Sequence, residues 1–558
     1  MNPLLPSVFL SPDALQSSKL MGRQSAGRGF MRGLAHAYAD QQETLHLVHG
    51  GGKQQAVLEM EARSTGWTAP ITHHLAQQPN AWPVGVMYYP APFNTRMAWQ
   101  RSRLGAGHMA LCGVTHTISS SGVLAQLADY VQGPFTGADA LICTSQSVLK
   151  VVQQVWQLQH EQLARRLGVH ALKTALPMTP VIPLGVHVDD FVTGPALRSQ
   201  ARAEWGLAQD EVAVLFVGRL SLHAKANPLP MYLACARAAA QTGQRVRVLE
   251  CGWFANDAIK DSFDEAARAA GVALTRIDGR VAGVTQRAFA AADVFMSLSD
   301  NIQETFGLTP LEAMAAGLPV VASDWNGYRE TVRDGIDGFL VPTAQPSDLS
   351  CSLAVSEAYE DGRINYDHYI GHAHLMVSVD VAACARALVR LIDDPVLRQQ
   401  MGAAGRERAR QVFDWQVVMG QYQALWTEQE SRRRALAAMA VPTVRDPAFT
   451  NPLLLFDHYP SATLEAERLL WRDPQATPEM AHAFRALGMW GFSGQRLVSA
   501  QEMATAWLAL PERGQHGMSV AQWSRGQGWP VSQGLRHAVW MHKMGLLSWD
   551  APAREVQA

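Results

Sequence analysis

The sequence predicts an α/β protein in which two doubly wound domains face a shared cleft and a small, mainly helical domain follows. Short apolar runs alternate with helix-like stretches from Ser7 to about Gly185, and the alternation restarts at "VAVLFVGRL" and lasts to about "GFLVP". Such runs, separated by helices, are typical of parallel strands covered on both faces. The 558 residues also exceed what one hydrophobic core supports.

The expected strands are short, apolar and rich in β-branched or aromatic residues. The first series is "SVFLS", "TLHLVHG", "PVGVMYY", "MALCGVTHTIS", "ALICTS" and "TPVIPLG". The second is "VAVLFVGRL", "RVRVLECGW", "ALTRIDG", "DVFMSLS", "PVVASDW" and "GFLVP", with helices such as "MYLACARAAAQTG" and "KDSFDEAARAAG" between them. Because ligands of doubly wound folds bind at the carboxyl ends of the strands, two such sheets in tandem predict a shared binding cleft.

Changes of texture along the chain predict the domain boundaries. The stretch "SEAYEDGRINYDHYIGHAHLM" is polar with scattered aromatics, which indicates a surface insertion, and "SRRRALAAMAVPTVRDP" indicates a linker. The last part of the chain holds seven of the sixteen tryptophans and has a helical pattern. We therefore predict an N-terminal domain at 1–195, a second domain at 196–430 with an insertion at about 345–379 and terminal helices, a linker at 431–445 and an accessory domain at 446–558.

Composition limits the class of function. Hydrophobic residues make up 48% and charged residues 17% of the chain, an ordinary globular balance. The net charge of −2 gives no overall field toward nucleic acid or an anionic membrane. The opening "MNPLLPSVFLSPDALQ" lacks the basic start of a signal peptide, and no apolar run is long enough to cross a bilayer. We expect a cytoplasmic protein, with peripheral contact at the inner face of the membrane left open.

Cysteines and histidines form no recognisable metal or redox pattern. The six cysteines are scattered without a CxxC pair, so we expect buried free thiols in a reducing compartment. His73 and His74 form an HH pair, and His372 and His374 form an HxH pair. Because no cluster of cysteines or carboxylates accompanies them, we expect no metal site there.

The stretch "ETFGLTPLE" carries two carboxylates, Glu304 and Glu312, with seven residues between them. It follows the strand "DVFMSLS" and leads into "PLEAMAAG", a run of helix formers that ends at Gly317. The start of this helix would present the N–H groups of Phe306, Gly307 and their neighbours to an anion. An anion with an acid on either side suggests a nucleotide diphosphate, whose hydroxyls the acids would bind. On spacing alone, a helix cap and a solvated glutamate explain the pair as well.

Two cations and a glycine-rich stretch add to this site. Arg219 and Lys225, in "VGRLSLHAK", follow the first strand of the second series and could neutralise a diphosphate, although each alone is an ordinary surface cation. In the first domain, "KLMGRQSAGRGFMRGL" places Gly22, Gly27 and Gly29 between a strand and a helix. A glycine loop there would allow a phosphate to approach the backbone closely.

Three motifs taken together resemble those of the retaining GT-B glycosyltransferases of family 4. They are, in this order, "VIPLGVHVDDF", "VGRLSLHAK" and "ADVFMSLSDNIQETFGLTPLEAMAAGLPVVASDWNGYRETVRDGIDGFLVP". The resemblance covers roughly residues 5–430 and implies two Rossmann-like domains, with the nucleotide sugar held mainly by the second. It implies transfer of a sugar, with retention at the anomeric carbon, to a glycan, lipid-linked or small-molecule acceptor in polysaccharide or glycoconjugate synthesis.

The resemblance also implies roles for single residues. Arg219 and Lys225 would bind the diphosphate, Glu304 the donor sugar and Glu312 the ribose hydroxyls. His116, in "GVTHTIS", falls where the family often has a histidine near the donor sugar, although a structural histidine also fits. The glycine stretch would line the donor phosphate, with the choice between its glycines open. The implied set is catalytic His116, Glu304, Arg219 and Lys225, and donor-binding Gly27, Gly29, Gly218, Arg219, Lys225, Glu304, Thr305, Phe306, Gly307, Leu308 and Glu312.

No DxD triplet, which holds a divalent metal in the other glycosyltransferase fold, occurs in the sequence. We therefore expect no metal and no cofactor other than the nucleotide-sugar co-substrate. Two other functions stay open. One is a phosphorylase or epimerase on the same fold, for which no pyridoxal-lysine signature is recognisable, and the other is a non-catalytic scaffold that acts through the C-terminal tail.

The tail has the pattern of a winged helix, with "SAQEMATAWLAL", "SVAQWSRGQG" and "PVSQGLRHAVWMHKMGLLSWD" as three helices and a strand-like end. The third helix would carry Arg536, His537 and Lys543. A nucleic-acid reader is basic, but 441–558 holds ten Lys plus Arg and ten Asp plus Glu. We therefore expect a module that docks a protein partner or an acceptor rather than nucleic acid.

Overall fold

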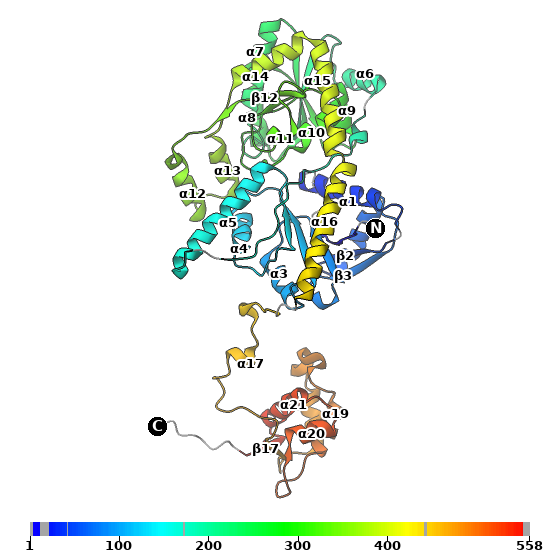
Figure 1. The fold of residues 1–558 in the computed structure, drawn as a ribbon, viewed down its shortest axis with the longest axis vertical. Helices are drawn as coiled ribbons and strands as arrows, with labels where there is room; N and C mark the ends of the chain where they lie inside the picture. The colour runs from blue at the N-terminus through cyan, green and yellow to red at the C-terminus, as the bar shows by residue number, and fades with distance from the viewer. Residues whose placement is uncertain are drawn as a thin grey trace. The chain divides into compact units, whose positions relative to one another are not determined.

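The computed structural model describes residues 4–11, 22–41, 43–170, 173–192, 194–439 and 443–550. The chain forms two compact units, Met1–Asp446 and Pro447–Ala558. The first unit holds both six-stranded parallel sheets, which confirms the predicted α/β architecture with two doubly wound domains (Figure 1).

The first sheet has the strand order β3-β2-β1-β4-β5-β6, and every pair is parallel. The winding reverses between β1 and β4, which places the topological switch point there. The expected strand "TPVIPLG" makes a single isolated bridge, between Val181 and Cys143, because its prolines lack N–H donors. The strands are β1 Ser7–Phe9, β2 Leu45–His49, β3 Ile71–Leu75, β4 Gly85–Tyr89, β5 Met109–Val114 and β6 Ala140–Ile142, and the helices are α1 Gly22–Ala37, α2 Gly52–Ser64, η2 Pro79–Ala81, α3 Thr95–Ser102, α4 Ser121–Asp129 and α5 Gln146–Leu167.

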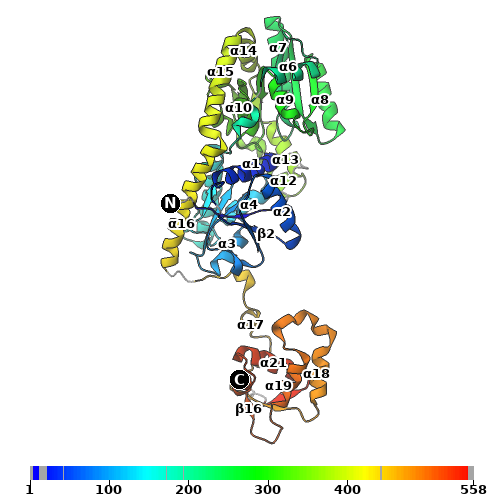
Figure 2. The ribbon, with the colours of Figure 1, turned by 90° about the vertical axis from the view of Figure 1, so that its right-hand side faces the viewer.

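The second sheet repeats the same winding, with the order β12-β11-β10-β7-β8-β9. Its switch point lies between β7 and β10. Helices cover both of its faces and bury the central strands (Figure 2). The strands are β7 Val212–Leu220, β8 Val246–Phe254, β9 Ala273–Asp278, β10 Val294–Ser297, β11 Val320–Ser323 and β12 Gly338–Val341, and the helices are η3 Val188–Phe191, α6 Pro195–Glu204, α7 Pro228–Thr242, α8 Asp257–Ala270, α9 Val284–Ala291, α10 Leu308–Ala315, α11 Tyr328–Thr331, α14 Val381–Asp393 and α15 Pro395–Arg408.

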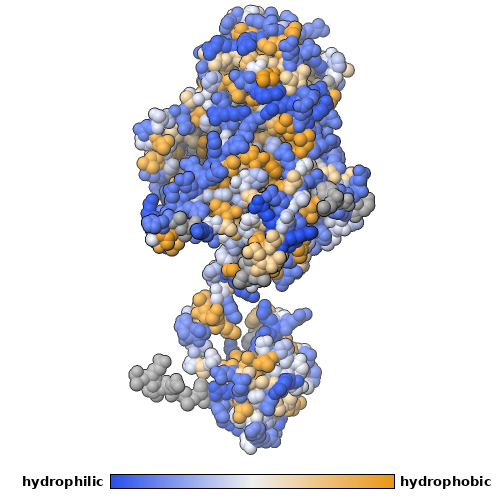
Figure 3. Space-filling view, in the orientation of Figure 1, coloured by the Kyte–Doolittle hydropathy of each residue, from blue (hydrophilic) through white to orange (hydrophobic). Residues whose placement is uncertain are grey.

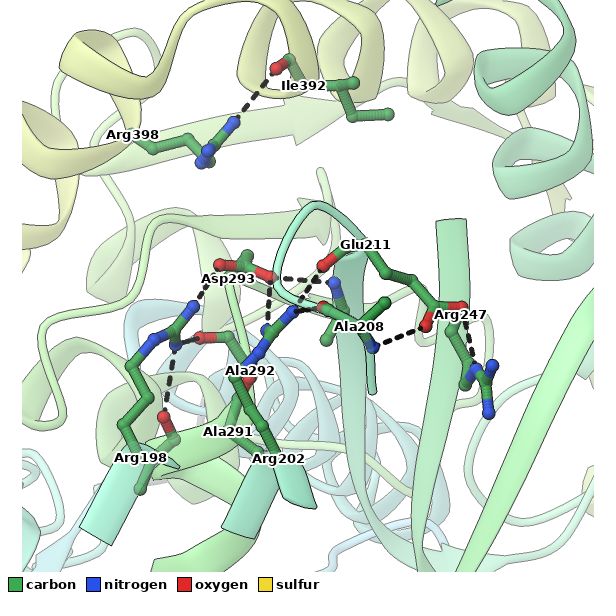
Figure 4. Close-up of polar contacts among 12 residues, drawn as sticks. Arg198, Arg202, Ala208, Glu211, Arg247, Ala291, Ala292, Asp293, Ile392 and Arg398 are labelled. Atoms are coloured by element: carbon green, nitrogen blue, oxygen red, sulfur yellow. Dashed lines mark hydrogen bonds and ion pairs between the residues drawn. The ribbon is translucent and has the colours of Figure 1, made fainter. Parts of the chain in front are cut away.

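A polar network fixes the start of the second domain. Asp293, just before β10, accepts hydrogen bonds from Arg198 Nη2 at 2.6 Å and Arg202 Nη1 at 3.1 Å, both on α6 (Figure 4). Its carboxylate also accepts the N–H of Ala213 at 2.8 Å, on β7. Because β7 and β10 flank the switch point, this network holds the two strands that carry the candidate site.

The expected insertion at 345–379 is a helical excursion. It begins with β13 Thr343–Ala344 and η4 Leu349–Ser352, continues through α12 Leu353–Glu360 and α13 Tyr366–His374, and closes with β14 Ser378–Val379. β13 and β14 pair antiparallel and close the base of the excursion. Both helices lie beside α4 and α5 of the first domain (Figures 1 and 2). The excursion therefore lies against the opposite domain and is not a free surface loop.

The helices that we expected to end the second domain return to the first. A π-helical turn, η5 Ala409–Phe413, leads into α16 Trp415–Ala438, which packs across the first sheet (Figure 1). Trp415, Tyr422 and Trp426 are no more than 2% exposed in the first domain's core. The predicted linker at 431–445 is wrong in its first half, because α16 continues to Ala438. The sequence did not predict this continuation of the helix, because a basic, alanine-rich run is typical of a linker as well as of a helix.

The second unit combines a three-stranded antiparallel sheet, in the order β16-β15-β17, with short helices. His537 is not displayed on its last helix: the side chain is fully buried, and its Nε2 accepts the N–H of Val498 at 3.2 Å. Arg536 and Lys543 are exposed. The elements are η6 Pro447–Phe449, α17 Pro452–Leu455, β15 Leu469–Arg472, α18 Pro478–Ala486, η7 Gly488–Arg496, α19 Ala500–Leu508, β16 Met518–Ser519, α20 Val520–Gly526, α21 Val531–Lys543 and β17 Leu547–Trp549.

The surface mixes hydrophilic and hydrophobic residues over the face of the first unit shown in Figure 3. Among the described residues, none of the helices has the length and apolar character needed to cross a membrane. Five of the six cysteines are buried, as expected, and Cys351 is exposed.

Candidate functional site

The candidate site lies at the switch point of the second sheet. Arg219 is near the carboxyl end of β7, and Glu304 is in the loop that follows β10. Because these strands are neighbours and parallel, their carboxyl ends meet at one edge of the sheet. The loop then enters α10, so the helix N-terminus opens at the same edge.

Glu304 is held by one cation and two backbone amides. Lys225 Nζ lies 3.3 Å from Glu304 Oε2. Glu304 Oε1 accepts the N–H groups of Thr305 at 3.1 Å and Phe306 at 3.3 Å. Burial opposes ionisation of the carboxyl, but the Lys225 ammonium and the two amides outweigh it and hold the pKa of Glu304 below its usual value. Glu304 is therefore a fixed, ionised carboxylate in the loop before α10.

Arg219 reaches the same loop through Gln303, whose Oε1 lies 3.5 Å from Arg219 Nη2. Gln303 is itself positioned by Asn301, whose Oδ1 accepts the Gln303 N–H at 2.8 Å. Gly218, one residue before Arg219, has a φ of +147°, a backbone conformation that residues with a side chain rarely adopt. The two cations named by the sequence thus both face the Glu304 loop.

The turn into α10 strongly favours glycine at two positions. Gly307 is the N-cap residue with a φ of +99°, and a Cβ there would lie 2.2 Å from a ring carbon of Tyr328. Gly327 packs against the other side of the turn, where a Cβ would lie 2.7 Å from Phe306 Cα. This packing fixes the direction of the N–H groups that open α10 toward the cleft.

Glu312, one turn further along α10, is partly buried, and its side chain makes no hydrogen bond or ion pair within the described part of the chain. Burial raises the pKa of Glu312 to about 7. A partly buried carboxyl group without a partner is typical of a site that binds a ligand.

Part of the second domain is similar to a known protein family. Residues 198–374 match the family described as Glycosyl transferases group 1. The chain is thus similar to this family over the core of its second domain, and we call the domain that contains residues 198–374 the group 1 domain. The phosphatidyl-myo-inositol mannosyltransferase of Mycobacterium leprae is 30% identical over 304 residues, which cover 52% of this chain and 66% of that protein. The D-inositol 3-phosphate glycosyltransferase of Geodermatophilus obscurus is 35% identical over 181 residues, or 31% of this chain and 39% of that protein.

The chain thus spans just under two thirds of the mycobacterial relative's length. Among solved structures, that of Anabaena HepE in complex with UDP and glucose matches with a TM-score of 0.48 and 18% identity. This match covers 76% of this chain and all of that one.

The group 1 domain contacts the first domain directly around the Glu304 loop. Ser145 Oγ donates to Thr305 O at 2.9 Å, and the N–H of Gln146 donates to Glu330 Oε1 at 2.7 Å. Both donors lie at the N-terminus of α5, where a carboxylate is favourable. The start of α5 is therefore hydrogen-bonded to the loop that carries the candidate site.

The predicted glycine loop is not a loop. Gly27 and Gly29 lie inside α1, and Gly22 is its first residue. Gly29 faces the indole of Trp415, since a Cβ at this position would lie 2.6 Å from Trp415 Nε1. Its carbonyl accepts a hydrogen bond from His187 Nε2 at 3.1 Å. Gly29 thus makes room for the crossing of α1 and α16, and the expectation that it lines a phosphate as part of a loop is wrong.

His116 lies two residues beyond β5 and is half-buried. The first domain therefore brings it to the cleft side of its sheet, as the strand pattern predicts. The HH and HxH pairs of the sequence do not converge on a metal: across the part of the chain that the structure describes, no group of three or more metal-ligating side chains forms. His374 Nδ1 instead lies 3.4 Å from the buried Asp300 Oδ2.

The sequence did not predict the residues that support the Glu304 loop. Asn326 has a φ of +36°, and its Nδ2 donates to Glu304 O at 2.6 Å. Trp325 Nε1 donates to Asn301 O at 3.1 Å. The Asn326-Gly327 pair is a turn signal in the sequence and could have located this support. No local signal would have identified Ser145, because its partner Thr305 is distant in the chain.

Proposed function

We propose that the chain is a glycosyltransferase that moves a sugar from a nucleotide-diphosphate sugar to an acceptor, with retention at the anomeric carbon. The observation that carries this proposal is the arrangement at the second switch point. There Lys225 and Arg219 face the ionised Glu304 beside the N-terminus of α10. Two cations and a helix N-terminus make a site for a diphosphate, and a fixed carboxylate next to it makes a site for sugar hydroxyls.

In this proposal each group has one task. Arg219 and Lys225 take the negative charge that develops on the leaving diphosphate, and the N–H groups at Gly307 and Leu308 add to it. Charge stabilisation that is arranged before the reaction is usually the largest catalytic contribution. Glu304 orients the donor sugar, and Glu312 binds the ribose hydroxyls. His116 stays on the first domain's side of the donor sugar.

The proposal assigns no side chain as a covalent nucleophile. The departing phosphate oxygen takes the proton of the attacking acceptor hydroxyl. Because the two cations supply the positive charge, we propose that the reaction needs no divalent metal. Activity that persists after treatment with EDTA supports this part, and activity that EDTA abolishes and Mg²⁺ restores contradicts it.

The names of the relatives support sugar transfer as the class of reaction. The nucleotide base, the sugar and the acceptor are left for experiment. We further propose that Pro447–Ala558 acts as a docking module and not as a nucleic-acid reader, since its charges balance.

The experiment is a thermal-shift panel of nucleoside diphosphates and their sugars. A ligand at 100 times its dissociation constant adds about 2.7 kcal/mol of stability. We expect one nucleotide to give a selective shift that Lys225→Ala and Arg219→Ala reduce. The control is Lys260→Ala, which removes an exposed ammonium from α8.

Glu304→Gln should still bind the free nucleoside diphosphate but lose transfer, because Arg219 and Lys225 remain in place while the charged contact to the donor sugar is lost. The product's anomeric configuration, read by NMR, tests retention. Equal shifts in the wild type and in all of these variants would contradict the site, and absence of any shift in the wild type would contradict the proposed function.

A further inference from the structure

A pocket of about 290 Å³ adjoins Glu304 on the side of the first domain. For comparison, an engineered apolar cavity of about 150 Å³ holds benzene, and pockets for small ligands start near 300 Å³. The pocket therefore has room for an aryl group or a short alkyl chain. Glu304 and Thr305 line one part of it, so the pocket is continuous with the candidate site.

Most of the pocket's lining is apolar. Seven of its twelve residues have apolar or aromatic side chains. Those that decide its character are Leu124, Val148 and Val151 from the first domain, Ile302 and Trp325 from the second, and Tyr369 from the excursion. The five polar residues of the lining are Ser119, Ser147, Glu304, Thr305 and Asn326. The apolar part of the surface gains free energy from burying hydrocarbon.

The excursion at 343–379 completes this pocket, and its tyrosines hold it against the first domain. Tyr366 Oη lies 2.7 Å from Ser119 Oγ, and Tyr359 Oη lies 3.0 Å from Ser121 Oγ. The Tyr359 and Tyr369 rings stack with centroids 4.5 Å apart, which positions Tyr369 at the pocket. These contacts bridge the cleft from the group 1 domain to the first domain.

The other end of the excursion is anchored within the group 1 domain. His374, the last residue of α13, pairs with Asp300 at 3.4 Å, and both side chains are about 5% exposed or less. Ile302 and Glu304 follow Asp300 in the same loop. Ile302 of the pocket and the Glu304 carboxylate thus lie on one loop, which the contact between Asp300 and His374 ties to the excursion.

We propose that this pocket binds an apolar aglycone of the acceptor, an aryl or alkyl group that carries or adjoins the accepting hydroxyl. This inference rests on the proposed function, because the pocket can bind part of an acceptor only if the protein transfers a sugar. In the proposed function, the polar parts of the donor are bound by Arg219, Lys225, Glu304 and Glu312, which leaves the apolar residues of the pocket without a role in donor binding.

The test measures binding of n-alkyl β-D-glucosides, from methyl to octyl and below their micelle concentrations, by isothermal titration to the full chain. Affinity should rise by about fourfold for each methylene that enters the pocket. Val151→Glu places a charge at the pocket wall and should abolish this dependence on chain length. Val151 is 37% exposed, so the fold tolerates the change.

Leu158→Glu is the matched control, since Leu158 lies on the same helix, is 58% exposed and does not line the pocket. It should keep the dependence on chain length. Equal affinity for methyl and octyl glucoside, or an unchanged dependence in Val151→Glu, would overturn the proposal.

Nucleotide binding is measured on the same samples. Chain-length dependence without any nucleotide binding would support the apolar pocket and contradict the proposed transferase. Nucleotide binding without chain-length dependence would contradict the aglycone site alone.

Discussion

Replacement of Glu312 by glutamine should make the protein more stable and its proposed donor site weaker. Burial raises the pKa of this carboxyl from 4.5 to about 7. In the unfolded chain the group loses its proton near pH 4.5, whereas in the folded protein it keeps the proton until about pH 7. Between these values the unfolded state binds fewer protons, so stability falls as the pH rises.

The size of the effect follows from the shift. Each pKa unit corresponds to about 1.36 kcal/mol, so ionised Glu312 costs about 3 kcal/mol of folding free energy above pH 7. The cost is absent below pH 4.5, where the carboxyl is protonated in both states. Glutamine has nearly the same shape and cannot ionise. The stability gap between Glu312→Gln and the wild type should therefore be near zero at pH 4.5 and about 3 kcal/mol at pH 8.

Hydrogen exchange of the α10 amides, compared between the two proteins at the same pH, reports this local gap without assuming that the two domains unfold together. Nucleotide affinity is measured in parallel and should fall about ten- to a hundredfold in Glu312→Gln, because hydrogen bonds to a charged acceptor contribute about 1.5–3 kcal/mol. A gap that does not change with pH, or a variant less stable than the wild type at pH 8, would refute the reasoning.

Two further predictions concern burial and backbone strain. Burial lowers the pKa of His537 to about 4, whereas the unfolded histidine takes up its proton near pH 6.5. The free energy of unfolding of the second unit should therefore fall by about 2 kcal/mol between pH 7 and pH 5. Urea unfolding followed by tryptophan fluorescence should show this loss in the wild type and not in His537→Gln. Gly307→Ala should lower the free energy of unfolding by about 3 kcal/mol, because φ is +99° and the new methyl group would overlap Tyr328. Gly335→Ala, where φ is +73° and the space is open, should lower it by only about 1 kcal/mol. Equal thermal midpoints for the two variants would contradict this account.

The sequence predicted the strands and the cleft because their signals are local. Apolar runs of the right length recur in both series, and the ends of parallel strands meet at one edge. Arg219 and Glu304 could therefore be assigned to one site, where Gln303 links them. The approach of Lys225 to Glu304 follows the same logic, since each lies just beyond one of two neighbouring strands.

The errors arose where the partner is distant in the chain. Gly29 reads as a loop glycine until Trp415, nearly four hundred residues later, is seen to fill its missing side chain. The excursion reads as solvated because its tyrosines are amphipathic, and only tertiary structure brings Tyr366 to Ser119. The burial of His537 could not be predicted, because periodicity does not tell which face of a short helix is buried.

The return of α16 to the first domain makes the order of synthesis matter. The last strand of the first sheet, Ala140–Ile142, leaves the ribosome roughly 300 residues before Trp415–Ala438, which carries Gln429 to the carbonyls of Leu111 and Ala138. At about 5–20 residues per second this delay is on the order of 15–60 s. During that time an apolar face of the nascent first domain lacks its cover. The domain that is made first is therefore completed after the group 1 domain. We expect a chaperone to have the longest time to bind the nascent chain at this uncovered face of the first domain.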